Sequence, residues 1–306
     1  MKIAVIGAGG VGGYFGARLA AAGYDVTFIA RGAHLDAIRR DGLRVESANG
    51  NLHLNVAATA DPATVGNADY IWIATKLWDT EAAAQTARTI TGPSTTVVSF
   101  QNGVEKEDVL RAALPGAHVM GGVSYIGATI ARPGVIAHTG TMARLEFGEF
   151  DGTRSGKAEA LLVACQKANV DAEIPEDISV AIWRKFIFLV GLSAVTSATR
   201  LPIGGWRHYT RTRELLLGIV REAMEVGRAL GVALTDELLQ ARLAQFEGLP
   251  AEMTSSMHQD LKRGNRLELP WLSGAVVRLG EAEGVPTPLN RAIWGVLFPY
   301  QDGAPR

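Results

Sequence analysis

The chain has 306 residues, of which 47% are hydrophobic, and its 30 basic side chains nearly balance 31 acidic ones. This length is enough for two domains with cores of their own, and the charge balance indicates neither nucleic acid nor another polyanion as a partner. The single cysteine, Cys165, excludes a disulfide within the chain and a cysteine-based metal cluster. That usage fits a reducing cytoplasm, and we expect Cys165 to fill a helix core.

The most informative segment is the N-terminal one, where a hydrophobic strand meets a glycine-rich turn. Residues 3–6 are short, apolar and rich in β-branched side chains, as in a strand buried on both faces of a parallel sheet. Gly7, Gly9 and Gly12 then follow in the spacing G-x-G-x-x-G and open a helix. In this motif the first glycine permits a tight turn, the second lets the backbone approach a pyrophosphate, and the third lets the helix pack closely on the strand.

The N–H groups at such a helix start, together with the helix dipole, stabilise phosphate charge. The motif therefore predicts a dinucleotide site, and the alternative is a purely structural glycine turn. The residues expected to bind the cofactor here are Gly7, Ala8, Gly9, Gly10, Val11 and Gly12.

The second predicted strand, residues 25–30, ends where the adenosine ribose of the dinucleotide should lie. An NAD-specific site usually offers Asp or Glu there to the ribose 2′-hydroxyl, but this chain offers Arg31. Asp25 begins the strand instead of ending it, so it does not replace the missing acid. Because a guanidinium pairs well with a 2′-phosphate, we predict NADP(H). The alternative is an ordinary solvated arginine.

Short apolar strands continue to alternate with helical stretches, which is typical of a doubly wound α/β sheet. The further strands are predicted at residues 70–75, 95–100 and 118–123. Residues 134–149 resemble antiparallel hairpin strands around His138, Thr139 and Gly140, and a helix at 155–168 and a strand at 172–174 would complete the domain.

After Pro175 the pattern changes to long helices without strand alternation. Residues 214–230, for example, have an amphipathic period and are followed by Gly231 as a C-cap. We therefore expect a Rossmann-type dinucleotide-binding domain at 1–175 and an all-helical domain at 176–306. The apolar stretch Phe186–Thr199 is shorter than the ~20 residues of a membrane-spanning helix, so we expect a buried helix and no membrane partner.

Polar side chains follow two of the predicted strands and would therefore lie at the carboxyl edge of the sheet, beside the cofactor. Lys76 follows strand 70–75, and Asn102, within Gln-Asn-Gly, follows strand 95–100. The plain alternatives are a loop lysine and a turn, because Asn-Gly is a favoured turn pair.

Lys185 lies in an otherwise apolar helical segment, where a lysine costs energy unless it is paired or used. Leu189 and Ser193 follow at four and eight residues, so the three share one helical face that can point into a cleft. The alternative for Lys185 is a snorkelling side chain. Farther on, Ser256 stands at a predicted helix start and Glu268 precedes Pro270, and these two could equally be capping and first-turn residues.

Taken together, these motifs resemble the ketopantoate reductase (2-dehydropantoate 2-reductase) family almost from end to end. The resemblance rests on GAGGVGGYFGARLA at residues 7–20, Arg31, Lys76, QNG at 101–103, WRK at 183–185 and SSMHQDLKRGNRLE at 255–268. It implies a Rossmann domain followed by a helical domain, with the active site in the cleft between them.

By that resemblance Arg31 would hold the 2′-phosphate, and Lys76 and Asn102 would contact the cofactor and help place the substrate. Lys185 would be the catalytic acid, which protonates the carbonyl oxygen of a 2-oxo acid as hydride arrives at carbon. Glu268 would position the substrate or the reduced nicotinamide and balance the charge of the lysine. Ser256 would bind substrate. We expect no metal, because the sequence has no H-E-x-x-H or comparable pair.

One feature departs from the family. Its members typically carry asparagine one turn after the lysine, and often another a turn later, whereas this chain has Leu189 and Ser193. A leucine cannot replace an amide that pairs with substrate. By the same resemblance, Ser193 would contact the substrate. Ketopantoate is the first expected substrate. A related NADP-dependent dehydrogenase for another 2-oxo or hydroxy acid, and a non-catalytic NADPH-binding redox sensor, are the alternatives, in a monomer or a homodimer.

Overall fold

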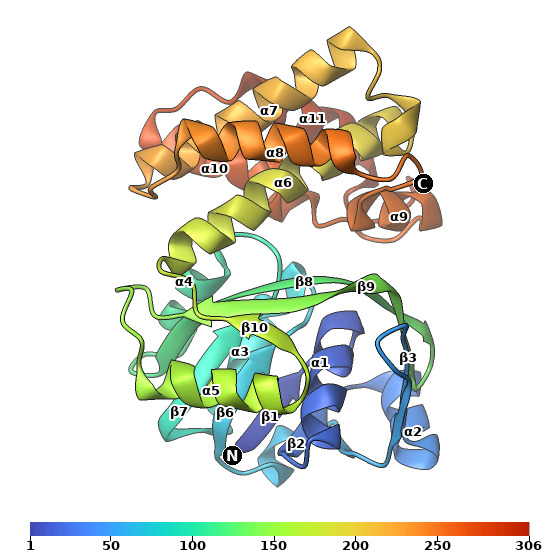
Figure 1. The fold of residues 1–306 in the computed structure, drawn as a ribbon, viewed down its shortest axis with the longest axis vertical. Helices are drawn as coiled ribbons and strands as arrows, with labels where there is room; N and C mark the ends of the chain where they lie inside the picture. The colour runs from blue at the N-terminus through green and yellow to red at the C-terminus, as the bar shows by residue number, and fades with distance from the viewer. Residues whose placement is uncertain (306) are drawn as a thin grey trace. The chain divides into compact units, whose positions relative to one another are not determined.

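The computed structural model describes residues 1–305 and divides the chain into two compact units (Figure 1). The first unit comprises Met1–Asn102 and Lys106–Ala181, and the second comprises Gly103–Glu105 and the chain from Ile182 onward. We expected the boundary after residue 175, and the first unit ends a few residues later, at Ala181. This point lies within helix α6 (Ile178–Thr199), whose residues are therefore divided between the two units.

The first unit is a sheet covered by helices. Its strands are β1 (Lys2–Ile6), β2 (Asp25–Ile29), β3 (Leu43–Glu46), β4 (Leu52–Leu54), β5 (Ala57–Thr59), β6 (Ala68–Ile73), β7 (Thr91–Ser99), β8 (His118–Arg132), β9 (Val135–Gly148) and β10 (Asp171–Glu173). Its helices are α1 (Gly10–Ala21), α2 (Gly32–Asp41), α3 (Thr80–Arg88), α4 (Lys106–Ala113) and α5 (Gly156–Lys167). The strand order is β4-β3-β9-β8-β7-β6-β1-β2-β5, with β10 beside β9.

The strands β5, β2, β1, β6, β7 and β8 are paired in parallel, and β9 returns antiparallel to β8. From β1 the chain goes to β2, forms β3 and β4 at the far end of the sheet beside β9, and returns to β5 beside β2. It then forms β6 on the other side of β1. The order of the strands therefore reverses at β1, which is where open α/β sheets bind their ligands. The predicted doubly wound sheet is confirmed.

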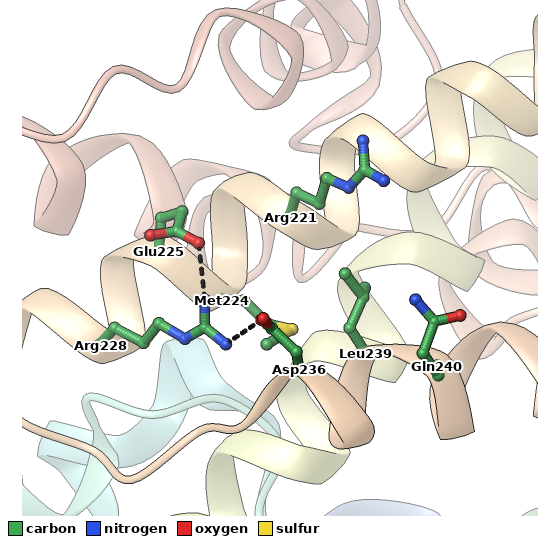
Figure 2. Close-up of a pocket in the computed structure, with 7 residues that line it drawn as sticks. All are labelled: Arg221, Met224, Glu225, Arg228, Asp236, Leu239 and Gln240. Carbon is green, nitrogen blue, oxygen red and sulfur yellow. Dashed lines mark hydrogen bonds and ion pairs between the residues drawn. The ribbon is translucent and has the colours of Figure 1, made fainter.

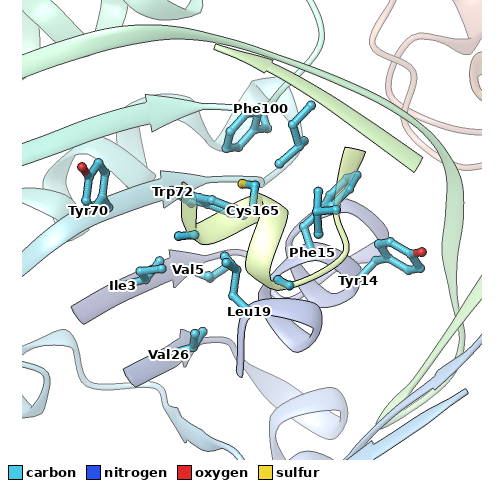
Figure 3. Packing of buried hydrophobic residues seen from close by; sticks show 14 of the residues in the cluster. Ile3, Val5, Tyr14, Phe15, Leu19, Val26, Tyr70, Trp72, Phe100 and Cys165 are labelled. Atoms are coloured by element: carbon cyan, nitrogen blue, oxygen red, sulfur yellow. The ribbon is translucent and has the colours of Figure 1, made fainter. Parts of the chain in front are cut away.

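The first strand shows why its sequence is a continuous apolar run. Ile3 and Val5 pack into a cluster with α1 and α5, whereas Ala4 and Ile6 pack into a second cluster with α3 and α4. Both faces of β1 are thus buried, as in other parallel sheets. Cys165 on α5 is fully buried in the first cluster, as Figure 3 shows, and burial raises the pKa of its thiol to about 12. Its predicted packing role is confirmed.

The predicted hairpin around His138, Thr139 and Gly140 is wrong. The turn lies earlier, at Gly134, whose φ of 78° is readily adopted by glycine, and β9 then runs from Val135 to Gly148 along β8. The pairing passes from Ala128↔His138 directly to Ile126↔Ala143, so residues 139–142 form a wide bulge opposite Gly127. The polar stretch that looked like a turn is this bulge.

The second unit is helical, and residues 182–305 contain no strand. Its helices are α6 (Ile178–Thr199), α7 (Thr210–Ala229), α8 (Asp236–Gly248), α9 (Ser256–Arg263), α10 (Ser273–Glu283) and α11 (Pro288–Leu297). Ile187 on α6, Ile219 on α7 and Val276 on α10 are fully buried in one core. The predicted all-helical domain is confirmed.

Helix α6 is long and apolar. It has 22 residues and a mean hydropathy of 1.8 over its most apolar window, of which 67% is buried inside the protein. The buried helix expected at Phe186–Thr199 is confirmed, although it begins at Ile178 and is therefore longer than the sequence indicated. It is the helix along which the chain passes from the first unit to the second (Figure 1).

Candidate functional site

The glycine loop follows β1, at the point where the strand order reverses. Gly7 has a φ of 100°, and a Cβ there would lie 2.8 Å from the backbone carbon of Ala74. A Cβ on Gly12 would lie 2.2 Å from the carbonyl oxygen of Gly7. Gly9 is different, because a Cβ there would meet nothing within 4 Å. Two glycines are therefore required by packing, and the third leaves open space above the loop.

This open space is where a phosphate group would approach the backbone. Gly9 is the N-cap of α1, and no side chain caps the helix there, so its first N–H groups are available to a ligand. Gly10, which we predicted to bind cofactor, has a packing role as well, since a Cβ on it would lie 2.0 Å from the carbonyl oxygen of Ala128 in β8. The loop fits the pyrophosphate of a dinucleotide.

His34 on α2 supports this loop, although no motif or spacing in the sequence points to that role. Its Nδ1 accepts a hydrogen bond from the backbone N–H of Gly134 at 3.0 Å, which leaves Nε2 to donate to the carbonyl oxygen of Ala8 at 2.8 Å. Burial lowers the pKa of His34, so the imidazole is held in its neutral form. The conformation of the loop therefore depends on a neutral histidine.

Arg31 lies two residues beyond β2 and its side chain is 84% exposed. Its Nη2 lies 3.1 Å from Oδ2 of Asp79, which ends the short 3₁₀ helix Leu77–Asp79 that follows β6. Lys76, just before that helix, is exposed, and its Nζ lies 5.5 Å from the centre of the Trp78 ring. The residues after β2 and after β6 thus meet at the carboxyl edge of the sheet.

Gln101 anchors this edge. Its side-chain amide donates to the carbonyl oxygen of Lys76 at 3.2 Å and to the hydroxyls of Thr75 and Thr80, while its Oε1 accepts from Ser99. Asn102, the predicted cofactor and substrate contact, follows directly and is half-buried. The buried glutamine in Gln-Asn-Gly ties the loop after β7 to the loop after β6, a role that sequence reasoning missed.

Four predicted cofactor positions are therefore brought to one edge of the first unit. Gly7, Arg31, Lys76 and Asn102 follow β1, β2, β6 and β7, which are neighbouring parallel strands. In a sheet of this kind the carboxyl ends of the strands line a single crevice.

The predicted catalytic side chains lie in the second unit. Lys185 is half-buried on α6, and Leu189, one turn later, is half-buried beside the helical core. Ser193 is only 1% exposed. Glu268 lies directly before the 3₁₀ helix Leu269–Trp271 and is 6% exposed, so its carboxylate is buried.

A buried network holds the start of α9 against α6. Ser255 caps α9 by accepting from the N–H of His258 at 3.0 Å, and its Oγ lies 2.9 Å from Oγ1 of Thr196. The carbonyl oxygen of Thr196 is in turn 2.7 Å from Nδ1 of His258. The cap of α9 is therefore Ser255, and Ser256, the predicted substrate contact, is left exposed at the first position of the helix.

The second unit also has a cavity of about 310 Å³ on α7 and α8 (Figure 2). It is lined by Arg221, Met224, Glu225, Arg228, Asp236, Leu239 and Gln240, none of which is a predicted site residue. One of its two cations is already paired, because Arg228 lies 3.0 Å from Glu225 and 2.6 Å from Asp236. Across residues 1–305, no group of three or more His, Cys, Asp or Glu side chains could hold a metal ion.

A glycine loop at the reversal point of a doubly wound sheet is typical of a dinucleotide-binding domain, and here that domain is joined to a helical unit. A family model described as ketopantoate reductase PanE/ApbA matches residues 3–152, and its C-terminal counterpart matches residues 177–301. The chain belongs to the PanE/ApbA ketopantoate reductase family, and the resemblance found in the sequence is confirmed.

Individual relatives agree with this assignment. A 2-dehydropantoate 2-reductase of Archaeoglobus fulgidus is 32% identical over 302 residues, which cover 99% of this chain and 98% of that one. The crystal structure of a PanE/ApbA family ketopantoate reductase from Ralstonia eutropha JMP134 aligns with a TM-score of 0.90 and 34% identity, over 98% of both chains. A D-mandelate dehydrogenase, solved with NADH and anilino(oxo)acetate, shares the fold with a TM-score of 0.89 at 22% identity over 98% of both chains.

Proposed function

We propose that this protein reduces a 2-oxo acid with NADPH, and that 2-dehydropantoate, reduced to pantoate in pantothenate biosynthesis, is its first substrate. The observation that carries the proposal is the open space above Gly9 in a loop whose other glycines are packed against backbone. Family membership supports the reaction, and Arg31 beyond β2 supports the phosphorylated coenzyme.

In this proposal the first unit binds the coenzyme. The loop from Gly7 to Gly12 holds the pyrophosphate through the N–H groups of α1, and Arg31 pairs with the 2′-phosphate. Lys76 and Asn102 contact the coenzyme and help to place the substrate. When bound, the coenzyme supplies a hydride to the carbonyl carbon of the 2-oxo acid.

The second unit supplies the groups for proton transfer and substrate binding. The ammonium of Lys185 stabilises the negative charge that builds on the carbonyl oxygen and donates a proton to it, which as general acid catalysis contributes about 10²- to 10⁴-fold in rate. Glu268, which is buried, balances the charge of the lysine and positions the reactants. Ser256 binds the substrate, and its exposed place at the start of α9 favours a carboxylate.

A second candidate substrate follows from Leu189. It lies one turn after Lys185 and is half-buried, so the face that presents the lysine is more apolar than an asparagine would make it. Ser193, a turn farther on, is buried and carries the remaining hydroxyl proposed for substrate recognition. A 2-oxo acid with a more apolar side chain is therefore the alternative to 2-dehydropantoate. The shared fold of D-mandelate dehydrogenase supports the view that this architecture accommodates such acids.

The test is NADPH oxidation by the purified protein with a panel of 2-oxo acids of graded polarity. We expect 2-dehydropantoate to give the highest kcat/KM, at neutral pH and without added metal. A higher kcat/KM for an acid with an apolar side chain than for 2-dehydropantoate would identify that acid as the substrate. Tight NADPH binding without turnover of any acid would indicate a non-catalytic NADPH-binding redox sensor instead of an enzyme. The proposal includes a cytoplasmic location, supported by one cysteine that is buried, and a monomer or a homodimer.

A further inference from the structure

Asp79 forms an ion pair with Arg31 and so lies near the end of β2, where NAD-specific sites usually have an acid and this sequence has none. An acid at the end of β2 is the usual partner of the ribose 2′-hydroxyl of NAD, and this chain has Arg31 beyond that strand. Asp79 arrives from another part of the chain, after β6, and its Oδ2 lies 3.1 Å from Nη2 of Arg31. Its side chain is 27% exposed, so the carboxylate is accessible to a ligand at the same edge of the sheet.

Helix capping does not account for this carboxylate. Asp79 is the N-cap of α3, but its side chain makes no capping hydrogen bond. It reaches Arg31 instead, 48 residues away in sequence. The position of Asp79 is fixed from the other side by its backbone, which donates to the carbonyl oxygen of Lys76 at 2.9 Å. The side chain is thus held toward the arginine that we assign to the 2′-phosphate.

We propose that Asp79 is a specificity-determining residue that lowers the preference of the protein for NADPH over NADH. This inference rests on the proposed coenzyme site. A ribose 2′-phosphate carries nearly two negative charges at neutral pH, so it must displace Asp79 from Arg31 and bind beside a like charge. The 2′-hydroxyl of NADH has no such charge, and it donates a hydrogen bond to the carboxylate. The wild-type protein therefore uses both coenzymes.

The experiment measures the dissociation constants of NADPH and NADH from the fluorescence of the bound reduced nicotinamide, without substrate or turnover. We compare the wild-type protein with Asp79→Asn and with Glu81→Gln. Glu81 is exposed in the first turn of α3, so its replacement removes the same charge from the same helix end, without involving Arg31. Thermal unfolding confirms that each variant is folded.

In Asp79→Asn we expect the ratio of affinities to move about tenfold toward NADPH, by tighter NADPH binding and weaker NADH binding, and the change to shrink at high salt. Glu81→Gln should leave the ratio unchanged. An equal ratio in the two variants would overturn the role of Asp79 and leave the coenzyme site intact. A wild-type protein that binds neither coenzyme would overturn the proposed function, and this inference with it.

Discussion

His34 holds the carbonyl group of Ala8 through a 2.8 Å hydrogen bond from its Nε2, and so joins α2 to the glycine loop. The opposite nitrogen, Nδ1, is occupied by the N–H of Gly134, 100 residues farther along the chain. A protonated ring could not accept that second bond, since both of its nitrogens would be donors. The loop is therefore coupled to the protonation state of one side chain.

We expect the stability of the first unit and its affinity for coenzyme to fall in mild acid because of this residue. The pKa of His34 is lower in the folded protein than in the unfolded chain, where it is about 6.5. Protonation therefore favours unfolding, so the contribution is complete above pH 6.5 and is lost as the pH falls from there through the lowered pKa. The measurement is the unfolding temperature between pH 5 and pH 8.

The variant His34→Gln keeps a donor near Ala8 but cannot titrate, so its unfolding temperature should vary less with pH over this range than that of the wild type. His208→Ala is the matched control, because His208 is exposed and lies in the second unit. If His34→Gln and the wild type lose stability in parallel on acidification, the coupling does not exist.

Replacement of glycine by alanine should have different effects at Gly9 and at Gly12. Gly9→Ala should fold normally, because Gly9 has a φ of −75° and open space around it. The new methyl group would nevertheless occupy the space that we propose for the pyrophosphate. Coenzyme affinity should fall at least tenfold. Gly12→Ala should instead lower the free energy of unfolding by about 1–3 kcal/mol, because its methyl group meets the carbonyl oxygen of Gly7.

Urea unfolding and NADPH titration of the two variants separate these effects. The assignment of Gly9 to the pyrophosphate fails if Gly9→Ala binds NADPH as the wild type does. Destabilisation of Gly9→Ala equal to that of Gly12→Ala would instead indicate that the loop is only a structural turn.

The features read correctly from the sequence are those that depend on neighbours in the chain. The apolar run before Gly7 and the glycine spacing are local, and each sets its own backbone conformation. The antiparallel turn was misplaced because Gly134 and Gly140 both have positive φ, and only pairing with β8 decides which of them reverses the chain.

The features that were missed arise from contacts between distant segments. His34 finds its second partner 100 residues away, Asp79 finds Arg31 48 residues away, and Gln101 binds the loop after β6 from the end of β7. The strands β3, β4 and β5 have only three or four residues each, which is too short for a clear period. Such contacts follow from the topology of the sheet and leave no pattern in the sequence.

Arg31→Ala should raise the KM for NADPH roughly tenfold or more and leave the KM for NADH nearly unchanged. Only NADPH offers a phosphate to the guanidinium, and a hydrogen bond to a charged group contributes about 1.5–3 kcal/mol. Steady-state kinetics with both coenzymes measures this. Arg40→Ala, on α2 and paired with Asp41, is the control for loss of a nearby exposed cation. Equal changes in the two KM values would remove Arg31 from the proposed role.

Lys185→Ala should lower kcat by about 10²- to 10⁴-fold while the dissociation constant of NADPH stays within about twofold of the wild type. In the proposed mechanism the ammonium acts when charge develops on the carbonyl oxygen, and it does not bind the coenzyme. Single-turnover kinetics and NADPH titration measure the two quantities separately. Lys262→Ala, an exposed position on α9 in the same unit, controls for the loss of a positive charge. Since α6 forms part of the helical core, thermal unfolding must show that Lys185→Ala remains folded. A folded variant with kcat near that of the wild type would exclude Lys185 as the acid, whatever its affinity for NADPH.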